Sequence, residues 1–321
     1  MKLMAFALVA MALSALAVQA QDAPRGKWME KAKFGVFIHF LGGGAQWNER
    51  VNAFDVAAVA KQVRDCRADY LILTLGQNSG TYCSPNATYD KLTGRKPGER
   101  CSTRDLPGDM ADALAGTGIK LLLYLPSRSP QRDQEAMEKL GDVHERKPAP
   151  QIFTQHWSAV IREWSLRYKT NVAGWWFDGS YNRAGWDDLT KPNNWNTWAA
   201  ACRAGNPDSI LAFNPGTRID KAFARLTAQQ DYTAGEQNSW TATPAKHPAP
   251  KGMRWQVLGF MGSRWGHCDG PRTSDDAMVK YIRTVNAQGG VVSIDVGISK
   301  ADGTIHPPHL KQLLAIGAAL R

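Results

Sequence analysis

Asp178 is the residue of this sequence whose surroundings most clearly indicate chemistry. It ends the apolar run Val172–Phe177, which contains Trp175 and Trp176, and Gly179 follows it. An ionised carboxylate among aromatic side chains is costly to desolvate unless a partner or a substrate uses it. Because Gly179 leaves room for a ligand to approach the backbone, we predict a functional carboxylate. A salt-bridged Asp that caps the following loop is the alternative.

A second carboxylate and many tryptophans extend this prediction. Several of the 12 tryptophans fall in segments expected to be loops. These are Trp47, Trp186, Trp195, Trp240 and Trp265. Aromatic faces in loops suit sugar rings, whose C–H groups stack on π surfaces while their hydroxyl groups reach polar neighbours. Together with Glu236 after a later apolar segment, Asp178 and these tryptophans indicate glycoside hydrolysis, in which two carboxyl groups flank the scissile bond.

Short apolar runs separated by amphipathic stretches must position these side chains. The expected strands are Phe34–His39, Tyr70–Thr74, Lys120–Tyr124, Gly174–Asp178, Ile210–Asn214, Gln230–Tyr232, Gln256–Phe260 and Val291–Asp295. The expected helices are Phe54–Cys66, Asp109–Gly116, Thr154–Tyr168, Asn194–Ala204, Ser274–Ala287 and Pro308–Leu320. Strand then helix, repeated, predicts parallel strands with crossover helices. Eight such units favour an α/β fold of the (β/α)8, TIM-like barrel type, since no GxGxxG motif follows the first strand.

Barrel enzymes carry their reacting groups at the carboxyl ends of the strands. The polar residues at the ends of these runs are His39, Gln77, Asn78, Tyr124, Asp178, Asn214, Glu236, the turn Trp265–His267, and Asp295. None of the cysteines has a CxxC or Cys/His spacing, so zinc is not indicated. We therefore predict chemistry that needs neither a metal nor a cofactor.

The first 20 residues are predicted to be a signal peptide. Lys2 precedes the uncharged, mostly apolar run Leu3–Val18, and Val18-Gln19-Ala20 places small or medium residues before a cleavage site. The run is too short to span a bilayer, and nothing later in the chain is long enough. We expect cleavage after Ala20 and a periplasmic or secreted protein without a membrane span. A buried N-terminal helix is the alternative for the leader. One catalytic domain would occupy residues 21–321.

The cysteines are assigned to structure. Their number is odd, so at least one remains unpaired even in an oxidising compartment. They are Cys66, Cys83, Cys101, Cys202 and Cys268. Cys83 and Cys101 bracket a polar loop and are the first candidates for a disulfide, although sequence does not define the connectivity.

The formal net charge of +10 at pH 7 indicates an acidic partner. The Lys and Arg residues are dispersed along the chain, which argues against nucleic acid. An acidic oligosaccharide or polysaccharide fits better, and binding to it should weaken as salt is added. Nothing in the sequence indicates the oligomeric state.

Several segments in chain order carry the motifs of one known family. They are Trp28 with Lys33–Phe40, Trp47–Glu49, Tyr70–Thr74, Gly174–Gly179, Asp231–Glu236, Ser263–His267, Gly289–Gly297 and Asp302–Ile305. In this order they resemble glycoside hydrolase family 29, the retaining α-L-fucosidases, over nearly the whole mature chain. The resemblance implies a (β/α)8 catalytic domain that removes terminal α-L-fucose by double displacement.

The resemblance also implies roles for single residues. Asp178 matches the nucleophile, Glu236 the general acid/base and His39 a contact to the sugar; Glu49 is the second candidate for the acid/base and Asp269 the third. Further contacts to the substrate are expected from Trp47, Gln77, Asn78, Tyr124, Trp176, Trp265 and His267.

One segment departs from the family pattern. Typical fucosidases carry Lys-His-His-Asp-Gly-Phe after the second strand, whereas this chain has Gly76–Thr81, with Gln77 and Asn78 in place of two sugar-binding histidines. Amides still donate and accept hydrogen bonds, but in a different pattern. Two hypotheses stay open: an exo-glycosidase for α-L-fucose or a related sugar, and a carbohydrate-binding or altered-specificity barrel without fucosidase activity. The β-sandwich that many family members append is expected to be absent.

Overall fold

The computed structural model describes residues 25–40, 43–142 and 147–321. At its centre is a sheet of seven strands in the order β5-β4-β3-β2-β1-β7-β6, and all neighbours are parallel. The strands are β1 (Phe34–Ile38), β2 (Tyr70–Thr74), β3 (Lys120–Pro126), β4 (Val172–Asp178), β5 (Ile210–Phe213), β6 (Trp255–Phe260) and β7 (Gly290–Val296). Because the strands are parallel, their carboxyl ends all meet at one edge of the sheet.

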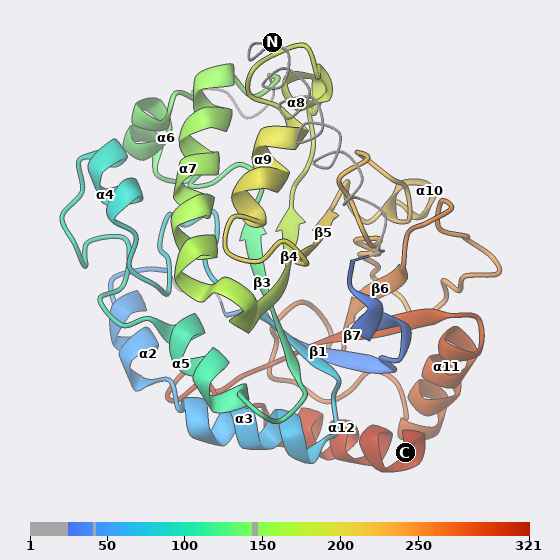
Figure 1. Cartoon of the computed structure of the whole chain (residues 1–321). Helices are drawn as coiled ribbons and strands as arrows, with labels where there is room; N and C mark the ends of the chain where they lie inside the picture. The colour runs from blue at the N-terminus through green and yellow to red at the C-terminus, as the bar shows by residue number, and fades with distance from the viewer. Residues whose placement is uncertain (1–24, 41–42, 143–146) are drawn as a thin grey trace, which may run out of the picture.

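Helices surround the sheet, which curls into a half-barrel (Figure 1). The helices are α2 (Trp47–Ala53), α3 (Val56–Asp65), α4 (Ala87–Thr93), α5 (Leu106–Leu114), α6 (Gln134–Leu140), α7 (Gln151–Tyr168), α8 (Ala184–Asp187), α9 (Trp195–Cys202), α10 (Ile219–Ala222), α11 (Asp275–Ala287) and α12 (Pro307–Leu320). Neighbouring helices pack in pairs, α3 with α5, α7 with α9, and α11 with α12. The alternation of strand and helix is the α/β, TIM-like arrangement expected from the sequence.

The expected eighth strand, Gln230–Tyr232, does not form a strand. The chain there instead bridges the two edge strands. The N–H of Asp231 donates to Leu211 of β5, and the N–H of Leu258 of β6 donates to Gly235, each over 2.9 Å. The edges are thus linked by separate hydrogen bonds and isolated bridges instead of a continuous strand, and the barrel is not fully closed.

Two local features explain why this segment is irregular. The Thr233 hydroxyl accepts from the N–H of Gln256 and donates to its carbonyl, both over 2.7 Å, and so replaces part of a backbone ladder. Gly235 has φ +62°, a left-handed conformation that interrupts an extended chain. A Cβ at Gly235 would also lie 1.9 Å from the carbonyl oxygen of Gln256, so only glycine fits there.

The six helices expected from periodicity form as α3, α5, α7, α9, α11 and α12, with shifted ends. The shorter helices α2, α4, α6, α8 and α10 form in segments that had no helical prediction. Some of them begin at capping side chains: Asn86 accepts from the N–H of Tyr89 in α4, and Asp133 from that of Ala136 in α6.

The prediction that Trp47 and Trp186 lie in loops is wrong, and so is that for Trp195, which the expected helix Asn194–Ala204 already contained. They belong to α2, α8 and α9, and their exposed fractions are only 7%, 0% and 2%. All three are part of the main hydrophobic core, where Trp186 and Trp195 pack with ring centroids 5.0 Å apart. Burial in the core leaves their faces closed to a sugar. Trp240 and Trp265 are half-buried and remain accessible.

The two faces of the sheet carry separate apolar clusters, because successive side chains of a strand point to opposite faces. Val36 and Ile38 of β1 join the large cluster against the helices. Phe37, Tyr124 and Trp176 belong to the smaller cluster on the inner face. This inner aromatic cluster forms the floor beneath the carboxyl ends of the strands.

The expected Cys83–Cys101 disulfide is absent, and all five cysteines are free thiols. The loop between them is held by backbone hydrogen bonds instead. Tyr82 donates to Arg100 and accepts from Ser102, each over 2.8 Å. Burial raises the pKa of Cys83 to about 12, so this thiol is not a nucleophile.

The predicted signal peptide, residues 1–20, lies outside the described residues. Among the helices that are described, none combines the length and the apolar character required to cross a membrane.

Candidate active site

Side chains from five strand ends meet at the carboxyl edge of the sheet. His39 directly follows β1, Gln77 follows β2, Tyr124 lies near the end of β3, Asp178 ends β4 and Asn214 directly follows β5. Four of these five were predicted as site residues. The parallel arrangement brings together positions that lie far apart in the chain.

Asp178 is held by three hydrogen bonds. Its Oδ2 accepts from the hydroxyl of Tyr124 over 2.6 Å. Its Oδ1 accepts from the N–H of Gly179 over 2.7 Å and from Nδ2 of Asn214 over 2.9 Å. Gly179 has φ +63°, which turns the backbone so that its N–H faces the carboxylate. Asp178 is half-buried and has a fixed orientation, as a nucleophile requires.

Asn214 joins Asp178 to Glu236. The same Nδ2 that donates to Asp178 also donates to Oε2 of Glu236. Two oxygens bonded to one nitrogen lie within about 6 Å of each other, twice the length of a hydrogen bond. A retaining glycosidase needs its two carboxyl groups about 5 to 5.5 Å apart, and the shared donor keeps this pair close enough for that spacing. Asn214 was noted at a strand end, but its bridging role was not predicted.

The irregular segment that follows β5 positions Glu236. Glu236 forms an isolated parallel bridge with Leu258 of β6, and the next residue, Gln237, donates its N–H to Leu258 over 2.8 Å. Burial, and then the charge of Asp178, raise the pKa of Glu236 to about 7. Glu236 therefore carries a proton over the range in which a general acid must donate one.

Gln77 connects His39 to Tyr124. Its amide nitrogen lies 2.5 Å from Nε2 of His39 and donates to the Tyr124 hydroxyl over 2.8 Å. An amide nitrogen only donates, so Nε2 of His39 accepts and the ring proton is assigned to Nδ1. Burial lowers the pKa of His39 to about 4, against the opposing effect of the Asp178 charge. His39 is therefore neutral near pH 7, and Nδ1 has no partner among the described residues.

Aromatic side chains shape the floor and one wall of the site. Trp176 stacks on Tyr124 with ring centroids 5.3 Å apart, and its indole N–H donates to the Ala234 carbonyl over 3.1 Å. Trp265 stands edge-on to His39 at 6.2 Å. Trp176 is 2% exposed and supports the hydrogen-bonded groups, whereas the half-buried Trp265 is open to a ligand.

The turn that carries Trp265 is fixed by a buried carboxyl group. Oδ2 of Asp295, the next-to-last residue of β7, accepts from the N–H of Gly266 over 2.7 Å. Asp295 is 1% exposed, and burial raises its pKa well above the usual range. This buried carboxyl group holds the turn beside His39.

Other predicted residues lie away from the carboxylate pair. Glu49 is exposed on α2, and Asp269 accepts from the N–H of Ser263 over 3.1 Å in the turn after β6. Trp47 is buried in the core. His267 is exposed on the wall of a cavity next to His39. These positions favour Glu236 over Glu49 and Asp269 as the acid/base.

Asn78 stays at the site edge, beside Gln77. Its side-chain oxygen is buried without a partner among the residues that the structure describes. Tyr181 was missed in the sequence. It is 52% exposed, and partial burial and the charges of Asp178 and Glu236 raise its pKa to about 12. Its position three residues after Asp178 is the signal that could have identified it.

Within residues 25–40, 43–142 and 147–321, no three His, Cys, Asp or Glu side chains gather as metal ligands would. The arrangement instead consists of a held carboxylate, a second carboxyl group with a raised pKa, and an aromatic floor. Glycoside hydrolases that act through two carboxyl groups use an arrangement of this kind.

Residues 45–321 match the alpha-L-fucosidase family, so the chain belongs to that family and is a glycoside hydrolase. None of the curated proteins compared is significantly similar in sequence.

Solved structures share the fold at low sequence identity. The alpha-L-fucosidase AlfC from Lactobacillus casei, in complex with α-L-fucose, is 16% identical with a TM-score of 0.60, over 91% of this chain and 96% of that chain. The endo-fucoidan hydrolase P5AFcnA of glycoside hydrolase family 107 is 14% identical with a TM-score of 0.69, over 89% and 91% of the two chains. A second endo-fucoidan hydrolase of that family, MfFcnA9, is 17% identical with a TM-score of 0.70, over 92% of this chain and 63% of that chain.

Proposed function

We propose that the protein is a retaining exo-glycosidase that removes terminal α-L-fucose, or a closely related sugar, from glycans. The observation that carries this proposal is the pairing of Asp178 with Glu236 through Asn214, combined with a pKa of about 7 for Glu236. Membership of the alpha-L-fucosidase family supports the choice of sugar.

In the first step, an oxygen of Asp178 forms a bond to the anomeric carbon while the bond from that carbon to the glycosidic oxygen breaks. The leaving oxygen takes the proton of Glu236. The products of this step are a glycosyl ester on Asp178, a Glu236 carboxylate and a free aglycone alcohol. The Tyr124 and Asn214 hydrogen bonds hold Asp178 in place for the attack.

In the second step, water attacks the anomeric carbon and gives a proton to Glu236, and the ester bond breaks. This returns Asp178 as a carboxylate and Glu236 as an acid. Because each step inverts the anomeric centre, the product sugar has the configuration of the substrate.

The sugar would be held by groups that lack protein partners. His39 offers an Nδ1–H donor and Asn78 a carbonyl oxygen, both buried without partners in the described part of the chain. The amide nitrogen of Gln77 donates its hydrogen bonds to His39 and Tyr124. Gln77 would therefore orient His39 rather than donate to the substrate. This division of roles would let two amides serve where typical family members carry two histidines.

The test is hydrolysis of a panel of aryl glycosides headed by the α-L-fucoside, with the product anomer followed by NMR. We expect release of the aryl alcohol with retained configuration, and loss of turnover in Asp178→Asn. An inverted product would refute the mechanism. Activity on another sugar alone would mean altered specificity, and sugar binding without turnover would support the binding-module hypothesis.

We also propose that the mature protein begins at Gln21 and acts in the periplasm or outside the cell. The charged residue followed by an apolar run at the N-terminus supports this location.

A further inference from the structure

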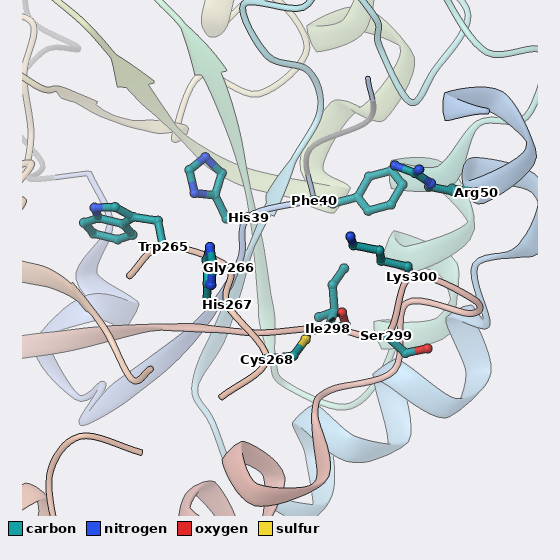
Figure 2. A pocket seen from close by; sticks show the side chains of 10 residues that line it. All are labelled: His39, Phe40, Arg50, Trp265, Gly266, His267, Cys268, Ile298, Ser299 and Lys300. Atoms are coloured by element: carbon teal, nitrogen blue, oxygen red, sulfur yellow. Dashed lines mark hydrogen bonds between the residues drawn. The ribbon is translucent and has the colours of Figure 1, made fainter. Parts of the chain in front are cut away.

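A cavity of about 350 Å³ opens beside His39 (Figure 2), and neither Asp178 nor Glu236 is among its lining residues. Its walls come from three places in the chain: the end of β1 with α2, the turn after β6, and the segment after β7. The lining residues are His39, Phe40, Arg50, Trp265, Gly266, His267, Cys268, Ile298, Ser299 and Lys300. Pockets of this volume lie within the usual range for small-molecule sites.

The cavity brings two cations together without an anion. Arg50 of α2 and Lys300 of the segment after β7 both line it, and no Asp or Glu is among the lining residues. Neither side chain makes an ion pair or a hydrogen bond among the interactions of the described residues. In Figure 2, Arg50 and Lys300 lie on one side of the cavity and Trp265 on the other. His39 lies between Trp265 and the two cations.

Two like charges that converge on one cavity repel each other unless an anion binds between them. Arg50 is half-buried, which reduces its screening by water, and its guanidinium group can donate two parallel hydrogen bonds to an oxyanion. Lys300 is exposed and adds a point charge at the rim. The formal net charge of +10 favours the approach of an anionic ligand to this surface.

His39 connects the cavity to the catalytic groups through hydrogen bonds. His39 lines the cavity and is linked by Gln77 and Tyr124 to Asp178, over 2.5, 2.8 and 2.6 Å in turn. Trp265 faces both His39 and the cavity. A ligand in the cavity would therefore contact His39, the first group of the hydrogen-bonded chain that ends at Asp178.

We propose that this cavity binds an anionic substituent, a sulfate ester or a carboxylate, on the sugar at the catalytic pair or on its neighbour. The proposal rests on the proposed function, since it names the substrate class of the same site. Arg50 is a specificity-determining residue, and Lys300 strengthens the attraction. The substrate class is thus an acidic glycan.

The experiment measures binding and hydrolysis separately. The probes are an α-L-fucosyl oligosaccharide that carries sulfate esters, the same oligosaccharide after chemical desulfation, and one that carries a uronic acid. Dissociation constants are measured by calorimetry for the wild type, Arg50→Gln, Lys300→Gln and the double variant. Lys246→Gln is the matched control, since it removes an exposed positive charge outside the cavity lining.

We expect the wild type to bind a charged probe more tightly than the desulfated one, and the preference to weaken as salt is added. Arg50→Gln should reduce this preference about tenfold and Lys300→Gln about threefold, since charge-assisted hydrogen bonds are stronger than exposed point-charge contacts. Lys246→Gln should retain the preference. Comparison of the sulfated and uronate probes decides which anion the cavity accepts.

Equal affinity of the wild type for charged and desulfated probes would overturn the inference, as would an unchanged preference in the double variant. Charge-dependent binding without hydrolysis of any probe would refute the proposed function and leave the anion site standing. Hydrolysis with retained configuration but without a charge preference would support the proposed function and refute the anion site.

Discussion

Replacement of Asn214 by leucine should move the basic limb of the pH–rate profile to higher pH. Nδ2 of Asn214 donates to the carboxylate of Glu236, which favours its ionised form. A hydrogen bond to a charged group contributes about 1.5 to 3 kcal/mol, and 1.36 kcal/mol corresponds to one pKa unit. Loss of this bond should raise the pKa of Glu236 from about 7 by about one to two units.

The assay is kcat/KM for an aryl glycoside with a poor leaving group, measured from acid to alkaline pH. With such a substrate, protonation of the leaving oxygen by Glu236 limits the rate, and kcat/KM reports the ionisation of the free enzyme. Leucine is close to asparagine in shape but makes no hydrogen bonds, and a thermal unfolding scan checks that the variant folds. Asn171→Leu is the control, since this exposed asparagine lies just before β4, at the opposite end of that strand from Asp178.

A basic limb that stays near pH 7, or moves to lower pH, would refute the assignment of Glu236 as the acid. A second variant tests the same point independently. Glu236→Gln should lose the basic limb and hydrolyse the poor substrate about 100-fold to 10,000-fold more slowly. It should form the glycosyl ester from a dinitrophenyl glycoside at nearly the wild-type rate, because that leaving group needs no proton.

Three further predictions follow from the same site and its surroundings. Tyr124→Phe removes the 2.6 Å hydrogen bond to Asp178 and should lower kcat about 10-fold to 100-fold, measured by steady-state kinetics; an unchanged kcat would exclude a positioning role for Tyr124. The buried Asp295 keeps its proton above the pH at which an unfolded Asp loses it, so stability should fall with rising pH by up to about 1.4 kcal/mol per unit. Asp295→Asn should remove this fall in a series of unfolding scans, and parallel curves for the two proteins would contradict the assignment. Expression of the full chain in a bacterial host should yield a periplasmic protein that begins at Gln21, as read by mass spectrometry, and a retained leader would argue against the signal peptide.

The strands and several site residues were predictable because the relevant physics is local. Buried parallel strands are short, nearly continuous apolar runs, so β2 and β4 could be identified from composition alone. A polar side chain directly after such a run must lie at the carboxyl edge of the sheet. This reasoning placed His39, Asp178 and Tyr124 at the site before any contact was known.

The prediction of the eighth strand failed for an equally physical reason. The expected strand Gln230–Tyr232 is followed by Thr233, whose hydroxyl replaces part of the ladder, and by Gly235, which turns the backbone. The second wrong prediction was that several tryptophans lie in loops. The pattern of the chain shows that a tryptophan is present, but only packing decides whether its face is buried, as in Trp186, or accessible, as in Trp265.

The sequence by itself determined the α/β class, the strand that carries Asp178 and the family to which the chain belongs. The tertiary structure decided which side chains lie next to Asp178. Glu236 rather than Glu49 lies beside it, because the irregular segment between β5 and β6 brings Glu236 to Asn214. Burial and electrostatic coupling depend on distances between residues that are remote in the chain, and folding alone sets those distances.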